Sequence, residues 1–183
     1  ALACAFIFLY VFELGKNLGR FNAMTGAVVA AVVFGFSSHF WSQCINAKGG
    51  LYSLNILIMA LMLWVTVKFK SPGRLYAVSF LFGLGLANHH TISAMALILG
   101  AYLLWEDGYA RKPAVLFNML LLAFLGTTLY LYLPIRASAK PLLNVGDTST
   151  WDRLMTHVTR SYYGNLSAYP RSMPLFWEQA SAY

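Results

Sequence analysis

The sequence has 183 residues, of which 59% are hydrophobic, 16% are aromatic and only 10% are charged. Soluble domains have about 45–50% apolar and about 25% charged residues, so this composition excludes an ordinary soluble domain. It also excludes a disordered chain, which needs low hydrophobicity, and a disulfide-stapled secreted module, because there are only two cysteines. An integral membrane protein remains. Its formal net charge of +7 indicates membrane topology rather than a nucleic-acid partner.

About six apolar segments are predicted to cross the membrane as helices. A hydrocarbon core of about 30 Å needs about 20 mostly apolar residues at a rise of about 1.5 Å per residue. The segments, in chain order, are residues 1–13, 24–41, 51–67, 75–88, 91–105 and 114–134. The first segment begins inside an apolar run, so we expect it to be truncated and the chain to be an internal piece of a longer polypeptide. The expected fold class is an all-α polytopic transmembrane helix bundle.

The apolar run from Leu75 to Trp105 has a polar centre. As a single helix it would be about 46 Å long, which exceeds one upright crossing of the bilayer. Its centre holds the sequence Asn88-His89-His90. We therefore expect two short helices that turn at these three residues.

The loops between the segments alternate in positive charge. One set of loops holds seven basic residues, and the opposite set holds only Lys48; the seven are Lys16, Arg20, Lys68, Lys70, Arg74, Arg111 and Lys112. Lys and Arg in short loops stay on the cytoplasmic side of a membrane. This bias predicts that the loop from Trp41 to Gly50, the turn at Asn88 to His90 and the chain after Pro134 lie outside.

The composition changes after Pro134, where Ser, Thr, Asn and Gly become frequent. We therefore expect residues 1–134 to form the transmembrane part and residues 135–183 an extracytoplasmic loop. Ser149 and Asp152 have the spacing of a capping box, which predicts an amphipathic surface helix over residues 150–163. On this helix Arg153, His157 and Arg160 would share one face.

Acidic residues, which often act as catalytic bases, are scarce. There are six of them, none in the middle of a spanning segment: Glu13, Glu106, Asp107, Asp147, Asp152 and Glu178. The chain also has no HExxH, GxSxG, phosphate-loop or CxxC motif. If the protein is an enzyme, we expect its base to lie outside this piece of chain.

Two groups of polar residues are candidates for a site. Asn88, His89 and His90 form either a polar turn at the water boundary or part of a ligand-binding site. A metal site is less favoured there, because adjacent side chains on a helix point about 100° apart. The second group holds Arg136 and the Arg153, His157 and Arg160 face, which would bind either one phosphate or lipid headgroups.

Several short motifs occur in the order typical of one polytopic membrane family. They are Phe40-Trp41-Ser42-Gln43, Leu51-Tyr52-Ser53-Leu54-Asn55, Gly83 to His90, Tyr132-Leu133-Pro134-Ile135-Arg136, Asn144-Val145-Gly146-Asp147 and Trp151 to His157. On these motifs the chain resembles a family long catalogued as a domain of unknown function. That family is now linked to protein O-mannosyltransferases of the GT-C glycosyltransferase superfamily. The resemblance extends from about Gly35 to Tyr163; the loop before Tyr52 departs from it by lacking an acidic residue.

The resemblance implies a GT-C type bundle and a membrane enzyme that takes a sugar from a polyprenyl-phosphate donor. The acceptor would be a protein or a glycan on the extracytoplasmic side of the membrane, which is the inner (plasma) membrane if the protein is bacterial. The catalytic acid of this superfamily usually lies in the first external loop, so we expect it upstream of this piece. Members work with a divalent metal or without one. The residues expected to bind the donor are Arg136, His157 and Arg160 at its phosphate and Asn88, His89 and His90 along the pocket.

Two other functions fit the composition. A transporter would place a midplane site at the break in residues 75–105, with His89 and His90 relaying protons. The charge alternation argues against it, because it places both histidines at the outer end of their helices. A non-catalytic scaffold subunit of an envelope complex fits the scarcity of acids. An acidic pair in a loop upstream of this piece would favour the transferase over both.

Overall fold

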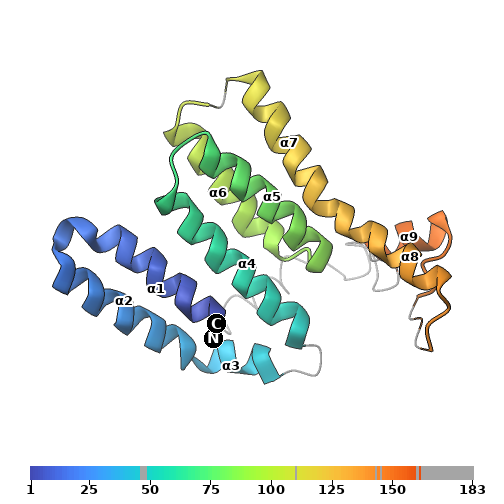
Figure 1. The fold of residues 1–183 in the computed structure, drawn as a ribbon, viewed down its shortest axis with the longest axis horizontal. Helices are drawn as coiled ribbons and strands as arrows, with labels where there is room; N and C mark the ends of the chain where they lie inside the picture. The colour runs from blue at the N-terminus through green and yellow to red at the C-terminus, as the bar shows by residue number, and fades with distance from the viewer. Residues whose placement is uncertain (46–48, 110, 143, 145, 160, 162–183) are drawn as a thin grey trace, which may run out of the picture. The chain divides into compact units, whose positions relative to one another are not determined.

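The computed structural model describes residues 1–45, 49–109, 111–142, 144, 146–159 and 161 (Figure 1). Within these residues the secondary structure is entirely helical and contains no strand, which confirms the all-α prediction. The chain divides into two compact units, Ala1–Leu129 and Tyr130–Tyr183, which we call unit 1 and unit 2 and describe separately.

Unit 1 consists mainly of apolar helices. They are α1 (Leu2–Gly15), α2 (Arg20–Gly35), α3 (Ser38–Ile45), α4 (Gly49–Lys68), α5 (Gly73–Asn88), α6 (Ile92–Glu106) and α7 (Pro113–Thr127), with a 3-10 turn η1 (Lys16–Leu18) between α1 and α2. In Figure 1, α1 lies between α2 and α4, and α5 packs against α4, α6 and α7. The prediction of two helices that turn at Asn88 to His90 is confirmed, because α5 ends at Asn88 and α6 begins at Ile92.

Two helical stretches are long and apolar enough to cross a membrane, Gly50–Lys68 and Pro113–Ser138. A third is added if α2 and α3, which are bent by 50° relative to each other, count as one span. Among the residues described, the expected number of about six is therefore not reached. α1, α5 and α6 are apolar helices of 14, 16 and 15 residues, which is about 21–24 Å and short for an upright crossing.

The segment expected to cross the membrane over residues 24–41 is interrupted, because α2 and α3 are separate helices. α2 ends at Gly35, and Ser37 lies in the break. The Ser37 hydroxyl donates to the Phe34 carbonyl at 2.9 Å and accepts the Phe40 N–H at 3.3 Å. One side chain thus satisfies backbone groups at the end of α2 and at the start of α3, which stabilises the break.

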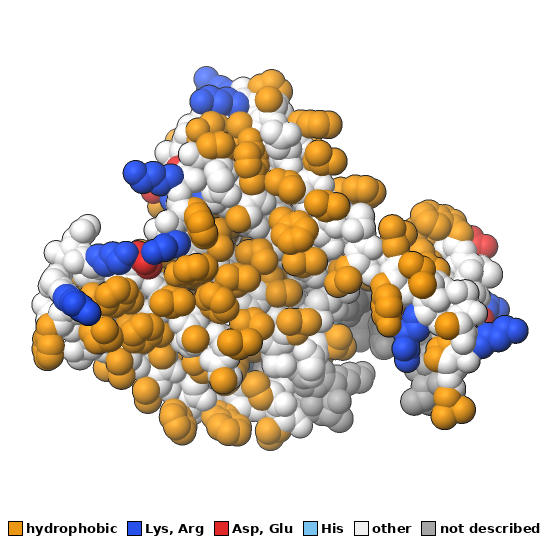
Figure 2. Space-filling view, in the orientation of Figure 1, with side chains coloured by type: hydrophobic (Ala, Val, Ile, Leu, Met, Phe, Trp, Pro, Cys, Tyr) orange, Lys and Arg blue, Asp and Glu red, His pale blue; other side chains and the backbone are white. Residues whose placement is uncertain are grey.

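The core of unit 1 is formed by α4, α5, α6 and α7. Its buried side chains are Ile58, Met62, Val65, Leu75, Val78, Leu81, Ile92, Ala96, Leu103 and Val115. Large apolar side chains on the other faces stay exposed, among them Phe21, Ile98 and Phe124. Figure 2 shows hydrophobic side chains spread over the surface of unit 1, as expected of helices that face lipid. The composition and the two long apolar helices place the protein in a membrane.

Two glycines allow α5 and α7 to approach closely. A Cβ atom added to Gly126 would lie 2.8 Å from the Gly83 Cα atom, and one added to Gly83 would lie 2.9 Å from the Gly126 Cα atom. Both distances are too short for real carbon contacts. Small residues at such a crossing let two membrane helices pack backbone to backbone, so this contact fixes where α7 lies on α5.

Unit 2 contains the helices α8 (Tyr132–Ser138) and α9 (Trp151–Val158), and α8 follows the 3-10 turn η2 (Thr128–Leu131). Pro134 was expected to mark the end of the last membrane segment, yet α8 continues past it to Ser138. Proline is tolerated there because the first N–H groups of a helix have no intrahelical acceptor. The membrane boundary at residue 134 stays a prediction.

The surface helix expected over residues 150–163 is shorter than predicted, because α9 ends at Val158. The predicted capping box is also wrong: the N-cap residue is Thr150, and no side chain caps the helix. Instead, a hydrogen bond from Ser149 is the main cause that lowers the pKa of the Asp147 carboxyl, with Arg153 contributing charge. Arg153 and Asn144 also donate to the Asp147 carboxylate, near the start of α9.

Candidate functional site

The six residues predicted to bind the donor fall into separate parts of the structure. Asn88, His89 and His90 lie in unit 1, at the end of α5 and in the turn before α6. Arg136 in α8 and His157 in α9 belong to unit 2, and both are exposed. Arg160 and Lys48 lie outside the described residues. A shared anion site for the two groups therefore stays a prediction.

Asn88 connects α5 to the start of α4. Its side-chain Nδ2 donates to the Leu51 carbonyl at 2.7 Å and lies 3.3 Å from Oδ1 of Asn55. Asn55 is in α4, among apolar neighbours, and only 3% of its surface is exposed. A buried amide needs hydrogen-bond partners, and the turn after α5 supplies them.

His89 terminates α5 and is buried. Its main-chain N–H donates to the Gly85 carbonyl at 2.7 Å, and 8% of the residue is exposed. The ring Nδ1 lies 2.9 Å from the Thr91 hydroxyl and 3.4 Å from the Thr91 backbone nitrogen. The ring is flanked by Tyr52, with centroids 5.2 Å apart, and by His90, which stacks at 4.8 Å.

Thr91 closes the cluster, because its hydroxyl also accepts a hydrogen bond of 3.0 Å from Nδ2 of Asn55. We call Asn55, Asn88, His89 and Thr91 the amide–histidine cluster. Sequence reasoning found Asn88 and His89 but missed Asn55 and Thr91. Asn55 did carry a signal, since it is a polar residue within a predicted span. Nothing in the sequence paired it with a residue 36 positions away.

Apolar pockets lie beside this end of unit 1. One of about 550 Å³ is lined by residues of α1, α2 and α3, including Cys4, Phe36 and Trp41. A second, of about 380 Å³, is lined by Phe40 and by Ser53, Leu54 and Leu57 of α4. The α4 residues flank Asn55 in sequence, so apolar space adjoins the part of α4 that carries the polar cluster.

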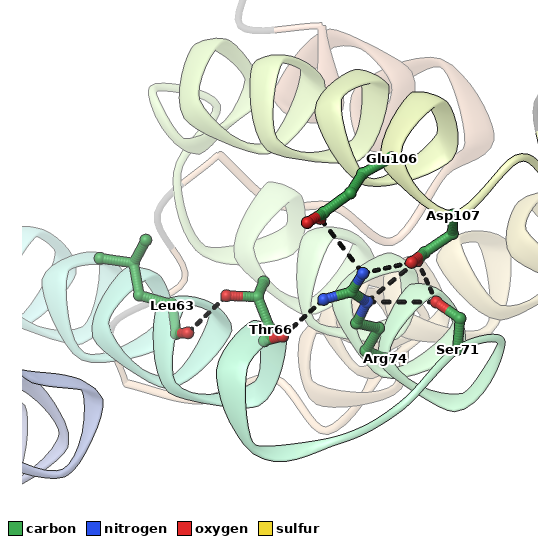
Figure 3. Close-up of polar contacts among 6 residues, drawn as sticks. All are labelled: Leu63, Thr66, Ser71, Arg74, Glu106 and Asp107. Carbon is green, nitrogen blue, oxygen red and sulfur yellow. Dashed lines mark hydrogen bonds and ion pairs between the residues drawn. The ribbon is translucent and has the colours of Figure 1, made fainter. Parts of the chain in front are cut away.

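The opposite end of α5 holds a charged cluster (Figure 3). Nε of Arg74 donates to Oδ2 of Asp107 at 2.9 Å, and its Nη2 contacts both Asp107 and Glu106. Nε also donates to the Ser71 hydroxyl at 3.1 Å, and Nη1 donates to the Thr66 carbonyl at 3.1 Å. We call these five residues the Arg74 cluster. It ties together the end of α4, the start of α5 and the end of α6.

The charges of the Arg74 cluster stabilise one another. The hydrogen bond from Arg74 lowers the pKa of the Asp107 carboxyl, burial opposes this, and the Ser71 hydrogen bond adds to it. The hydrogen bond to Asp107 raises the pKa of Arg74 against burial. A pocket of about 650 Å³ adjoins the cluster and is also lined by Glu13 of α1. Glu13 pairs with Lys16 and, at 3.1 Å, with Lys68.

A metal site is not formed by the described part of the chain, where no three His, Cys, Asp or Glu residues lie close enough together to hold an ion. The two ends of α5 differ in the polar groups that they hold. The Arg74 cluster is built around an arginine that is paired with two carboxylates. The amide–histidine cluster consists of two amides, a hydroxyl and an imidazole.

Residues 1–113 match the family model described as the protein O-mannosyl-transferase TMEM260 N-terminal domain. The chain belongs to this family. The match covers more than half of the chain and includes α1 through α6, and with them both clusters. It confirms the relation to protein O-mannosyltransferases that the motifs indicated. Arg136 and His157 lie beyond the matched residues. No curated protein and no solved structure matches the chain.

Proposed function

We propose that this chain is part of a membrane glycosyltransferase that transfers a sugar from a polyprenyl-phosphate donor to a hydroxyl group outside the cytoplasm. The observation that carries the proposal is the membership of residues 1–113 in a protein O-mannosyl-transferase family. By that precedent the sugar is mannose and the acceptor is a protein. The apolar helices support a lipid-linked donor, because such a donor is presented at the membrane surface.

The amide–histidine cluster is the proposed binding site for the polar part of the donor. Asn88, His89 and His90 are proposed to line it, because amide and imidazole groups bind sugar hydroxyls and phosphate oxygens. The apolar pockets at this end of unit 1 would accept part of the lipid chain. Arg136, His157 and Arg160 are proposed to bind the phosphate, since guanidinium groups bind phosphate oxygens in a bidentate way.

The proposed reaction is direct displacement at the anomeric carbon. A carboxylate outside this piece of chain takes the proton of the acceptor hydroxyl, whose oxygen forms the new bond to the anomeric carbon. The bond from that carbon to the phosphate oxygen breaks, and the electron pair leaves with the polyprenyl phosphate. Cationic side chains stabilise the charge that develops on this leaving group. The reaction is compatible with a divalent metal or with none.

The test is sugar transfer by the purified full-length protein from labelled polyprenyl-phosphate donors to acceptor peptides. Loss of one charged contact to the leaving group costs about 2–4 kcal/mol in the transition state, or roughly 30- to 1,000-fold in rate. We expect Arg136→Ala and Arg160→Ala each to lose that much, and Arg→Lys to restore only part of it.

The matched control is Arg111→Ala, which removes an exposed arginine from the turn between α6 and α7. It should transfer sugar at the wild-type rate. If both unit 2 variants match this control, their arginines do not bind the donor. If the wild-type protein transfers sugar from no lipid-linked donor, the transferase proposal is wrong, and the transporter or scaffold function takes its place.

A further inference from the structure

The donor and the acceptor in each hydrogen bond of the amide–histidine cluster can be assigned by starting from the Leu51 carbonyl. The Leu51 carbonyl oxygen can only accept, so the group of Asn88 that lies 2.7 Å from it is the NH₂ group. The same NH₂ group lies 3.3 Å from Asn55, whose facing atom must therefore be its carbonyl oxygen. The other side of the Asn55 amide, which faces Thr91 at 3.0 Å, is then its NH₂ group.

The direction continues through Thr91 to the histidine ring. The Thr91 hydroxyl oxygen accepts from Asn55, so its own proton is available for Nδ1 of His89, which lies 2.9 Å away. The backbone N–H of Thr91, which can only donate, points at the same ring nitrogen over 3.4 Å. Two donors thus face Nδ1. A ring nitrogen that accepts cannot carry a proton, and a neutral imidazole then carries it on Nε2.

We propose that the relay from the Leu51 carbonyl through Asn88, Asn55 and Thr91 holds His89 as the neutral Nε2–H tautomer. Asn55 and Thr91 are positioning residues, because they act through the ring and not on the ligand. A ring held in this form is a hydrogen-bond donor at Nε2. Any ligand atom that pairs with this N–H is therefore an acceptor, and His89 is not the base of the reaction.

The class of ligand rests on the proposed function. In a lipid-linked sugar phosphate, the acceptor oxygens are those of the phosphate and of the sugar hydroxyls. A neutral donor suits both and is cheaper to bury beside apolar helices than a charged group. The tautomer itself follows from the contacts within unit 1 alone, so it can be tested apart from the ligand.

The first measurement is the ¹⁵N NMR spectrum of histidine-labelled full-length protein in nanodiscs at pH 7, with His89 assigned from the spectrum of His89→Gln. Protonated and unprotonated ring nitrogens have well-separated shifts. We expect a protonated Nε2 and an unprotonated Nδ1. A protonated Nδ1 in the wild-type protein would overturn the proposal.

Two substitutions at Thr91 separate the relay from a structural role. Thr91→Ser keeps the hydroxyl and should keep the Nε2–H tautomer. Thr91→Val keeps the branched shape but removes the hydroxyl, so a measurable fraction of Nδ1–H should appear. The matched control is Thr127→Val on α7, where an exposed hydroxyl bonds only locally to the Phe124 carbonyl. An unchanged His89 spectrum in Thr91→Val would contradict the relay.

Asn55→Asp gives a test of direction. The substitution replaces the NH₂ donor with a carboxylate oxygen, towards which the Thr91 hydroxyl would turn its proton. The Thr91 oxygen would then face Nδ1 with a lone pair and favour a proton on that nitrogen. We expect the Nδ1–H fraction to rise above that of Thr91→Val. A spectrum like that of the wild-type protein would overturn the assigned direction.

The last measurement is sugar transfer. Thr91→Val should lower kcat/KM for the lipid-linked donor by about 10-fold, and Thr91→Ser should restore most of it. An unchanged kcat/KM in Thr91→Val would overturn the role of the relay in donor recognition. If the wild-type protein transfers no lipid-linked sugar, the proposed function fails, while the NMR result still decides the tautomer.

Discussion

The two ends of α5 hold their polar groups in opposite ways. At the Gly73 end, Arg74 uses its donors on two carboxylates, a hydroxyl and a carbonyl. At the Asn88 end, the partners are two amides, a hydroxyl and an imidazole. Asn88 lies fourteen positions after Arg74 along α5, a distance of about 21 Å.

The difference between charged and uncharged groups indicates that the Arg74 end stabilises the fold and that the Asn88 end can also bind a ligand. Charged groups are costly to remove from water, so they are tolerated between helices only when every partner is in place. The role of such a cluster is to hold helices together. Neutral groups cost less to desolvate, and some of their hydrogen bonds can be exchanged for bonds to a ligand. We therefore expect substitutions at the first end to affect folding and those at the second to affect binding as well.

The largest effect on stability is expected for Arg74→Ala. The substitution leaves the Asp107 carboxylate, which is 11% exposed, without its cationic partner. Removing one partner of this part-buried ion pair should cost about 3 kcal/mol in the free energy of unfolding. The measurement is denaturant unfolding of the full-length protein in detergent. Arg111→Ala, at an exposed site, should stay within about 0.5 kcal/mol of wild type. Equal losses in both variants would mean that the Arg74 cluster does not hold the helices.

A smaller loss is expected for Asn55→Ala. It leaves the Asn88 amide and the Thr91 hydroxyl without the partner between them, which costs about 1–3 kcal/mol. The control is Asn118→Ala on α7, an exposed amide whose 3.3 Å contact to the Tyr76 hydroxyl should contribute little. Both variants are compared with wild type by thermal unfolding. A loss in Asn55→Ala no larger than in the control would show that the buried amide is dispensable.

Acid should weaken the Arg74 end more than the Asn88 end. The folded-state pKa of Asp107 is lowered, so its stabilising contribution is complete above its unfolded pKa of about 3.9. It is lost as the pH falls below that value and through the folded-state pKa. The fall in Tm from pH 7 to pH 3.5 should be smaller in Arg74→Gln than in the wild-type protein. In Asn55→Ala the fall should be as large as in the wild-type protein. An equal fall in wild type and Arg74→Gln would contradict the coupling.

The smallest effect is expected for Lys68→Gln. The Lys68 side chain is 45% exposed, and Glu13 keeps Lys16 as a partner after the substitution. Exposed ion pairs contribute about 0–1 kcal/mol, and salt screens them. The difference in unfolding free energy from wild type should therefore be small and should disappear in about 1 M salt. A loss that persists in high salt would mean that this pair acts like the Arg74 cluster.

Local features of the sequence determined the fold class and the position of the polar turn. The length of the apolar segments predicts helices, and Asn88-His89-His90 interrupts one of them where α5 ends. The sequence did not predict how two serines interact with nearby backbone. Ser37 bonds to the backbone where α2 ends, and Ser149 does not cap α9. A serine hydroxyl has several acceptors within reach, and the motif alone does not choose among them.

Only the tertiary structure decided which polar residues act together. Asn55 and Thr91 meet because α4 and α5 run in opposite directions, so that the start of α4 reaches the end of α5. The same arrangement brings the Thr66 carbonyl to Arg74 at the other end. Hydrophobic periodicity defines each helix but not the register between two helices. That register depends on how the side chains of the core pack and on where a buried amide or guanidinium finds its partners.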